Sequence, residues 1–171
     1  MILSVHAVFG AAVASLVPSH PVAAFGLGFV SHFALDFIPH KDYKLKSIET
    51  GDDKKIHLVD SIYKKFRIMR DISLVSFDAF LGILVSFLLF FNSIHPWVFL
   101  IGSISSLIPD FLTFIYLLIK HKPLGLFYHF HVNLIHSKFI LKLNQLTGVL
   151  VQFCTVGVLI AIMFSIRYLL I

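Results

Sequence analysis

Charged residues are scarce in this sequence. Only 13% of its 171 residues are charged and 58% are hydrophobic, and the mean hydropathy is +0.92. A soluble domain is typically about 45 to 50% apolar and about 25% charged. The composition therefore excludes an ordinary soluble domain and indicates an integral membrane protein.

Cysteine is almost absent as well, because Cys154 is the single one. One thiol cannot form an intramolecular disulfide framework or a cysteine-based zinc site. A metal site in this chain would therefore have to use His, Asp or Glu. No Lys or Arg precedes Ala12, so the basic start of a cleaved signal peptide is missing, and we expect the first apolar segment to be retained.

Long apolar runs make up most of the chain, and a membrane-spanning helix needs about 20 such residues. The runs cover 2–17, 21–38, 71–91, 96–119 and 146–171. Short turns at Pro18 to Pro21 and at Asn92 to Pro96 predict two helical hairpins, with Pro21 opening the second helix. We therefore expect an all-α fold: one integral membrane domain over 1–171, a bundle of four to five transmembrane helices.

Basic residues predict the orientation of the bundle. Of the 14 Lys and Arg, nine lie between Lys41 and Arg70 and four between Lys120 and Lys142. The positive-inside rule places segments 40–70 and 120–145 in the cytoplasm, with the N-terminus inside. We expect a prokaryotic inner (plasma) membrane protein. The basic residues flank spans and accompany no nucleic-acid motif, so no nucleic acid is expected as a partner.

Three aspartates interrupt the apolar runs, and a carboxylate inside a membrane is expensive unless it faces the bundle interior and has a partner. Each lies on a helical face with small residues, where helices approach closely. The rows are His6-Gly10-Ala14, Gly28-His32-Asp36, Asp78-Gly82-Ser86 and Gly102-Ser106-Asp110. By helical rise, the ionisable members share one depth, in the cytoplasmic half of the bilayer. We expect His6, His32, Asp36, Asp78 and Asp110 to converge.

The segment from Ser31 to His40 is the richest in polar side chains. His32 and Asp36 are spaced i, i+4 and can bind one cation together, and His40 follows just past the helix end because Pro39 disfavours helical geometry before it. The alternative is a hydrogen-bonded His-Asp pair that only holds two helices together.

Further histidines follow the fourth run. His131 and His136 lie among aromatic and aliphatic residues, so we expect them to fold back onto the membrane and add to the site. A set of His and Asp ligands suits a divalent metal, above all zinc, with manganese or iron as alternatives. Asp78 is then a candidate general base.

Three of these motifs together carry a family resemblance. They are His6 near the N-terminus, Gly102 followed after six residues by Pro109-Asp110, and His131 followed after four residues by His136-Ser137. In this combination the chain resembles the small inner-membrane proteins classed as membrane-bound metal-dependent hydrolases. The resemblance implies a helical membrane protein with a divalent-metal hydrolase site.

Residues 57–70 have the pattern of a basic interfacial helix, with Leu58, Ile62, Phe66 and Met69 on one face. Such a helix would bind anionic lipid or a phosphorylated substrate; the alternative is a plain basic flank of the third span. The sequence thus predicts a metal-dependent hydrolase acting on a lipid or phosphorylated substrate. The alternative is a non-catalytic protein: a metal or proton carrier, or a scaffold held together by polar side chains. The oligomeric state is not predicted.

Overall fold

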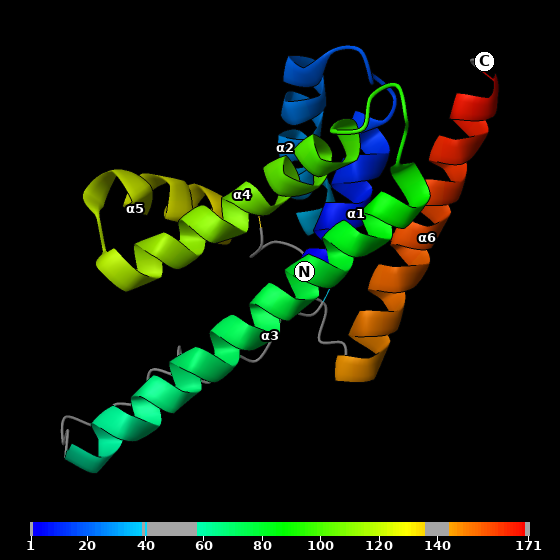
Figure 1. The fold of residues 1–171 in the computed structure, drawn as a ribbon. Coiled ribbons are helices and arrows are strands. Elements are labelled where there is room, and N and C mark those ends of the chain that lie inside the picture. The colour runs from blue at the N-terminus through cyan, green and yellow to red at the C-terminus, as the bar shows by residue number, and fades with distance from the viewer. Residues whose placement is uncertain (1, 39, 41–57, 136–143, 170–171) are drawn as a thin grey trace.

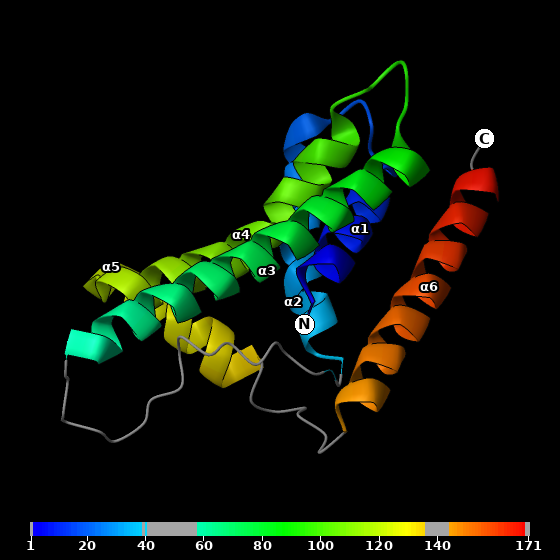
Figure 2. The same cartoon turned by 60° about the horizontal axis from the view of Figure 1, so that its bottom comes forward.

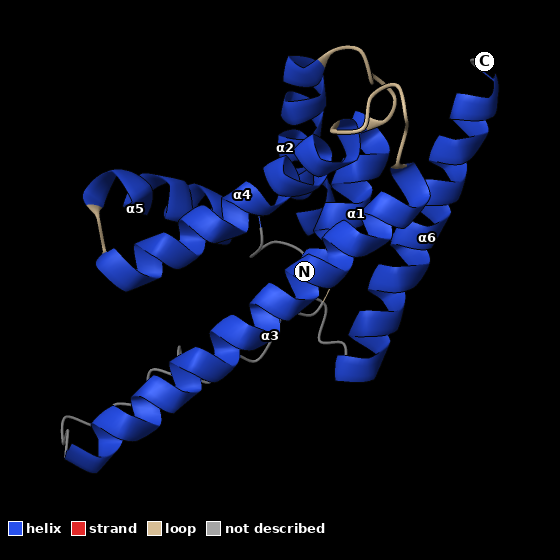
Figure 3. Cartoon of the chain, viewed as in Figure 1, coloured by secondary structure: helices blue, strands red, loops and turns tan. Residues whose placement is uncertain are grey.

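A computed structural model describes residues 2–38, 40, 58–135 and 144–169. All the regular structure in these residues is helical, which confirms the all-α class (Figure 3). The elements in chain order are α1 (Leu3–Ala14), α2 (Pro21–Asp36), α3 (Leu58–Phe90), α4 (Val98–Ile119), α5 (Lys122–Tyr128), the π-helix η1 (His129–Ile135) and α6 (Gln145–Leu169).

Three of these helices are long and apolar enough to cross a membrane: Lys65–Phe90 in α3, Val98–Leu117 in α4 and Leu146–Ile166 in α6. In α3 and α6 only 11% of the apolar window is buried inside the chain, against 39% in α4. The apolar side chains of α3 and α6 therefore face mostly outward, as expected of helices in lipid.

The first two helices are shorter than the predicted spans 2–17 and 21–38. α1 has 12 residues and α2 has 16. At about 1.5 Å per residue, α1 rises about 18 Å, well short of the roughly 30 Å hydrocarbon core. The first hairpin is therefore not long enough to cross a bilayer as straight helix.

α1 forms the centre of the bundle. It packs against α2, α3, α4 and α6 (Figure 1). Among the described residues, each of three buried apolar clusters includes α1 side chains: Val5 with Leu35 and Val156; Val8, Ala11 and Ala12 with Phe90; and Ala14 with Ala24 and Val98. Because α1 is enclosed, a polar side chain on it has to be satisfied by other protein groups or by a bound ion.

Glycine and serine let α1 and α4 approach closely. A Cβ added at Gly10 would lie 2.5 Å from the Gly102 carbonyl oxygen. At this contact the Ser103 hydroxyl donates to the Ala7 carbonyl oxygen (3.1 Å), and the Ser106 hydroxyl donates to the His6 carbonyl oxygen (2.9 Å). The small-residue faces that the sequence predicts for these two helices are the faces that meet.

The two hairpin turns lie at the same end of the bundle (Figures 1 and 2). α2 begins at Pro21, as predicted. In the second turn the Asn92 Oδ1 accepts hydrogen bonds from the N–H groups of Ile94 (2.8 Å) and His95 (3.3 Å). The start of α1 and the end of α2 therefore lie together at the opposite end.

α3 starts at Leu58. The basic stretch before the predicted third span and the span itself therefore form one continuous helix. No Gly or Pro occurs between Leu58 and Leu81, and nothing there breaks a helix. The first turns of α3 extend away from the bundle (Figure 2). Lys65, Arg67 and Arg70 are exposed on them.

α4 ends in a sharp reversal. Lys120 has a left-handed backbone (φ 52°) and its N–H donates to the Tyr116 carbonyl oxygen at 2.8 Å, a common way to terminate a helix. α5 then starts at Lys122 and packs back against α4. This reversal carries η1 to the end of α2.

Replacing a glycine by alanine at two different positions tests the contact between α1 and α4. Gly102→Ala places a Cβ against Gly10 and Ala14, whereas Gly26 has open space around it. We expect Gly102→Ala to lower stability by about 1 to 3 kcal/mol through overpacking, and Gly26→Ala to be neutral or slightly stabilising because Ala is the better helix former. Thermal unfolding in detergent measures both. Equal melting temperatures for the two variants would contradict the close contact.

Candidate metal centre

Five ionisable side chains from four elements meet where α1 begins and α2 ends. These residues, called the buried centre below, are His6 of α1, His32 and Asp36 of α2, Asp110 of α4 and His131 of η1. Two overlapping groups have ligand atoms within 4.8 Å of one another: His6, His32 and Asp110, and His32, Asp36 and His131. The buried centre therefore has the residue types and the spacing to hold a metal ion.

The tightest part of the centre surrounds Oδ2 of Asp36. His32 Nε2 lies 3.0 Å from this oxygen and His131 Nε2 lies 2.9 Å from it. The two Nε2 atoms are 3.0 Å apart. All three side chains are buried.

A hydrogen bond on the far side of His32 determines what its Nε2 can do. His32 Nδ1 is 2.7 Å from the Ser106 carbonyl oxygen, which can only accept, so Nδ1 carries a hydrogen. In the neutral ring Nε2 then holds a lone pair, and this lone pair faces a carboxylate oxygen. Two acceptors repel each other unless a cation lies between them. A metal ion meets this requirement, and so does a hydrogen carried by His32 Nε2, by Asp36 or by the neighbouring His131 Nε2.

His6 adds a second indication that the centre can hold a cation. Its side chain is fully buried, and within the described part of the chain neither ring nitrogen has a hydrogen-bond partner. Its Nε2 lies 3.3 Å from Asp36 Oδ1. A buried polar group without a hydrogen bond is costly, and ligation of an ion removes that cost.

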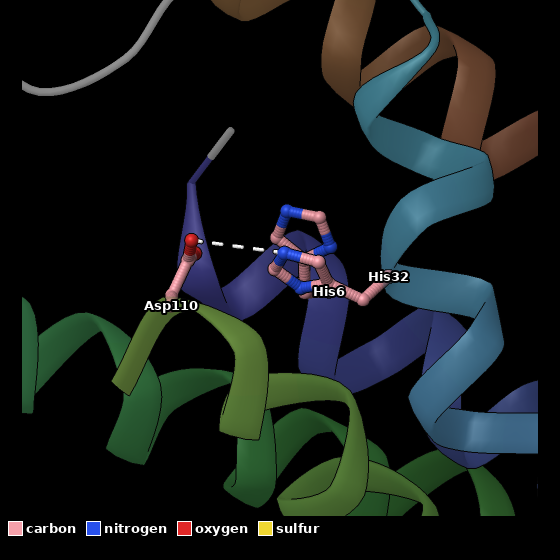
Figure 4. A group of neighbouring side chains, drawn as sticks. All are labelled: His6, His32 and Asp110. Carbon is pink, nitrogen blue, oxygen red and sulfur yellow. Dashed lines mark ion pairs between the residues drawn. The ribbon is translucent and has the colours of Figure 1, made fainter. Parts of the chain in front are cut away.

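Asp110 is the accessible member of the buried centre. Its side chain is 27% exposed, and its Oδ1 lies 3.6 Å from His32 Nε2 and 3.8 Å from His131 Nε2. Figure 4 shows the stacked rings of His6 and His32 with Asp110 opposite them.

The spacing of the ligand atoms fits a divalent metal. Atoms at about 2.0 to 2.1 Å from a tetrahedral ion lie about 3.3 Å from one another. His32 Nε2, His131 Nε2 and Asp36 Oδ2 lie 2.9 to 3.0 Å from one another, and Asp110 Oδ1 lies 3.6 and 3.8 Å from the two Nε2 atoms. Imidazole and carboxylate ligands suit zinc, manganese and iron alike.

A π-helix positions His131. η1 is such a helix, a rare form that often occurs at functional sites. Phe33 packs against His131 with ring centroids 5.7 Å apart, and Phe127 does so at 5.9 Å. Phe130, which is partly exposed, packs edge-on against Phe33 at 5.7 Å. These three rings, called the aromatic wall below, hold His131 and cover one side of the centre.

The sequence predicts Asp78 in the buried centre as a general base. Among the described residues, the structure instead places its carboxylate at the start of α1. Its Oδ2 accepts a hydrogen bond from the Ser4 N–H at 3.0 Å. Ser4 is in the first turn of α1, where backbone N–H groups lack helical partners and an acidic group is favourable. Asp78 therefore acts at the start of α1. The other predicted ligand, His136, lies outside the described residues.

Sequence reasoning missed two residues that orient the histidines. Ser106 accepts from His32 through its carbonyl oxygen, and the Thr113 hydroxyl lies 2.8 Å from His131 Nδ1. Metal-binding histidines commonly have such a partner on the other ring nitrogen. Thr113 follows Asp110 by almost one helical turn, so the sequence alone could have placed it on the same face of the helix as Asp110. Its pairing with His131 depends on the reversal after α4, which the sequence pattern does not predict.

No family model, no curated protein and no solved structure matches this chain. Function therefore has to be inferred from the geometry of the buried centre.

The hydroxyl of Thr113 provides a sharp test of this geometry. Thr113→Val keeps the shape of the side chain but removes the group that orients His131, so we expect divalent-metal affinity to fall by about 10- to 100-fold. Thr113→Ser keeps the hydroxyl, so its divalent-metal affinity should stay close to that of the parent. Titration with zinc or manganese measures the affinities. A Val variant that binds as tightly as the Ser variant would show that Thr113 does not support a ligand.

Proposed function

We propose that this protein is a membrane-embedded, metal-dependent hydrolase whose buried centre acts on a phosphorylated lipid. The observation that carries the proposal is the convergence of His32 Nε2, His131 Nε2 and Asp36 Oδ2 within 3.0 Å of one another. His32 is held in the tautomer that directs a lone pair inward. The set suits a zinc ion, and manganese and iron fit the same ligand chemistry.

The chemistry divides among the residues of the centre. A divalent metal bound there would make water more acidic and polarise a phosphoryl oxygen. His32, His131 and Asp36 are the ligands, because they are buried and mutually close. Asp110 takes the role of general base, since its partly exposed carboxylate lies at the accessible side, 3.6 Å from His32 Nε2.

The overall reaction requires only water. A water oxygen adds to phosphorus while Asp110 receives a proton, and the phosphorus–oxygen bond of the ester breaks. The leaving alkoxide takes up a proton from solvent and Asp110 returns its proton to solvent, so the products are an alcohol and a phosphate. No oxidant or second substrate is needed.

Two features favour a lipid substrate with a phosphorylated head group. The aromatic wall places apolar rings next to the centre, where they can contact an acyl chain. Lys65, Arg67 and Arg70 are exposed on the first turns of α3, and each basic residue near a membrane surface attracts anionic lipid by roughly 1 kcal/mol. The apolar helices around the centre fit a substrate that arrives from the bilayer.

By the positive-inside rule, the distribution of Lys and Arg favours an N-terminus in the cytoplasm, and the membrane we propose is a prokaryotic inner membrane. In that orientation the basic start of α3 would lie at the cytoplasmic surface. The centre would then act on the cytoplasmic leaflet.

A transport function fits less well. A carrier needs exchangeable polar groups along a path across the membrane. The buried hydroxyls of Ser103, Ser105 and Ser106 in α4 instead donate to backbone carbonyl oxygens at 2.9 to 3.1 Å. The bonds of Ser103 and Ser106 join α4 to α1, and that of Ser105 lies within α4. The ionisable groups of the buried centre are gathered at one end of the bundle.

Metal content and stability, measured on the same preparations, separate a metal site from a purely structural cluster. We expect Asp36→Asn and His32→Ala each to abolish retention of a divalent metal, because each removes a ligand. Asp36→Asn also removes the buried charge and should leave the protein folded and inserted, whereas His32→Ala leaves the Asp36 carboxylate with one partner fewer and should also lower the melting temperature. Asp78→Asn is the matched control: it keeps an acceptor for the Ser4 N–H, so metal content should match the parent. Elemental analysis without chelator and melting temperature are the measurements.

A different combination of metal content and melting temperature would favour a scaffold protein. If the parent protein carries no metal and both Asp36→Asn and His32→Ala lower the melting temperature, the cluster serves only to join helices. Each such polar contact between membrane helices is worth about 0.6 to 2 kcal/mol.

Hydrolysis itself is tested with phosphatidic acid in mixed detergent micelles, by release of inorganic phosphate. The metal-loaded parent should release phosphate, and chelator should stop it. At equal metal content, Asp110→Asn should lower kcat by about 100-fold or more, because it removes the general base. Glycerol phosphate should react more slowly, since it lacks the acyl chains that the aromatic wall would contact. If the metal-loaded parent releases no phosphate, this activity is refuted. If Asp78→Asn loses phosphate release and Asp110→Asn keeps it, the general base is Asp78 of α3.

A further inference from the structure

The two oxygens of Asp36 face different histidines. Oδ2 is close to His32 and His131, at 3.0 and 2.9 Å. Oδ1 is 3.3 Å from His6 Nε2 and 4.0 Å from His40 Nε2. One carboxylate therefore lies between two pairs of imidazoles, which is how a carboxylate bridging two metal ions is placed.

His40 is oriented like a ligand on the Oδ1 side. Its Nδ1 is 2.7 Å from the Ile38 carbonyl oxygen, so Nδ1 carries the hydrogen and the neutral ring has its lone pair on Nε2. The side chain is buried just past the end of α2. His32 shows the same arrangement on the Oδ2 side, with Nδ1 donating to a carbonyl oxygen.

The stacking of His6 on His32 also favours two ligand positions. Their ring centroids are 4.0 Å apart and their planes differ by 21° (Figure 4). Both Nε2 atoms face the Asp36 carboxylate, each toward a different oxygen. Nearly parallel rings serve two adjacent ions better than one, and the ions of two-metal centres lie about 3.5 to 4 Å apart.

We infer that the buried centre, together with His40, binds two divalent metal ions bridged by Asp36. The first position is formed by His32, His131 and Asp36 Oδ2, with Asp110 at its accessible side. The second is formed by His6, His40 and Asp36 Oδ1. His6 supports the second position independently, because its ring is fully buried without a hydrogen-bond partner among the described residues and ligation would satisfy it.

This inference rests on the proposed metal binding and adds that the number of ions is two. In a two-metal centre, one ion can stabilise the attacking oxygen and the other the leaving oxygen of a phosphate ester. The second position lies on the Oδ1 side of Asp36, where His6 and His40 approach it.

Metal stoichiometry and manganese magnetic resonance test the inference without measuring activity. The full-length protein in detergent is loaded with Mn²⁺, freed of excess ion and analysed for bound metal. We expect two equivalents per chain and the spectrum of two magnetically coupled Mn²⁺ ions. His6→Gln and His40→Gln should each bind one equivalent with an uncoupled spectrum. His20→Gln, a change at an exposed histidine in the first hairpin turn, should retain two coupled ions.

Each other outcome is decisive. One equivalent with an uncoupled spectrum in the parent overturns the second position and leaves the proposed single-metal hydrolase intact. No bound metal in the folded parent overturns both proposals. The spectrum of the parent needs no substitution, so the test stands even if His6→Gln fails to fold; His40→Gln, at the edge of the bundle, then provides the comparison.

Discussion

The carboxylate of Asp36, buried among histidines, is the interaction on which the rest of the site depends. A carboxylate buried among apolar helices is expensive unless it is paired. Here three separate elements bring an imidazole to it: α1 supplies His6, α2 His32 and η1 His131. Removing one partner of such a buried group commonly costs about 3 to 5 kcal/mol. The charge on Asp36 and the packing of the helices around it are therefore linked.

The close contact between α1 and α4 makes this convergence possible. Gly10 and Gly102 bring the two backbones together, and Ser106 joins both halves of the site. Its hydroxyl contacts the backbone of His6, while its carbonyl oxygen orients the His32 ring. A larger residue at this contact would separate the helices and would also move His6 relative to His32. Packing and ligand geometry are thus set by the same few small residues.

The separation of Asp78 from the buried centre shows how two aspartates with similar sequence surroundings acquire different roles. Both Asp78 and Asp110 lie in apolar helices, and both share a helical face with Gly and Ser. Asp110 faces His32 and His131, whereas Asp78 receives the Ser4 N–H at the start of α1. Either placement lowers the cost of a buried carboxylate, so burial alone does not distinguish a ligand from a helix-capping group.

The sequence alone determined the helical class, the two hairpins and the small-residue faces, because apolar length and i, i+4 spacing are local properties. It also brought His32 and Asp36 together, since one helix holds both. The tertiary structure alone decided that α1 is an enclosed helix of 12 residues, that Asp78 caps it, and that the reversal at Lys120 delivers His131 to Asp36. These outcomes depend on which helices pack side by side and on a left-handed residue after α4, and neither leaves a periodic signal in the sequence.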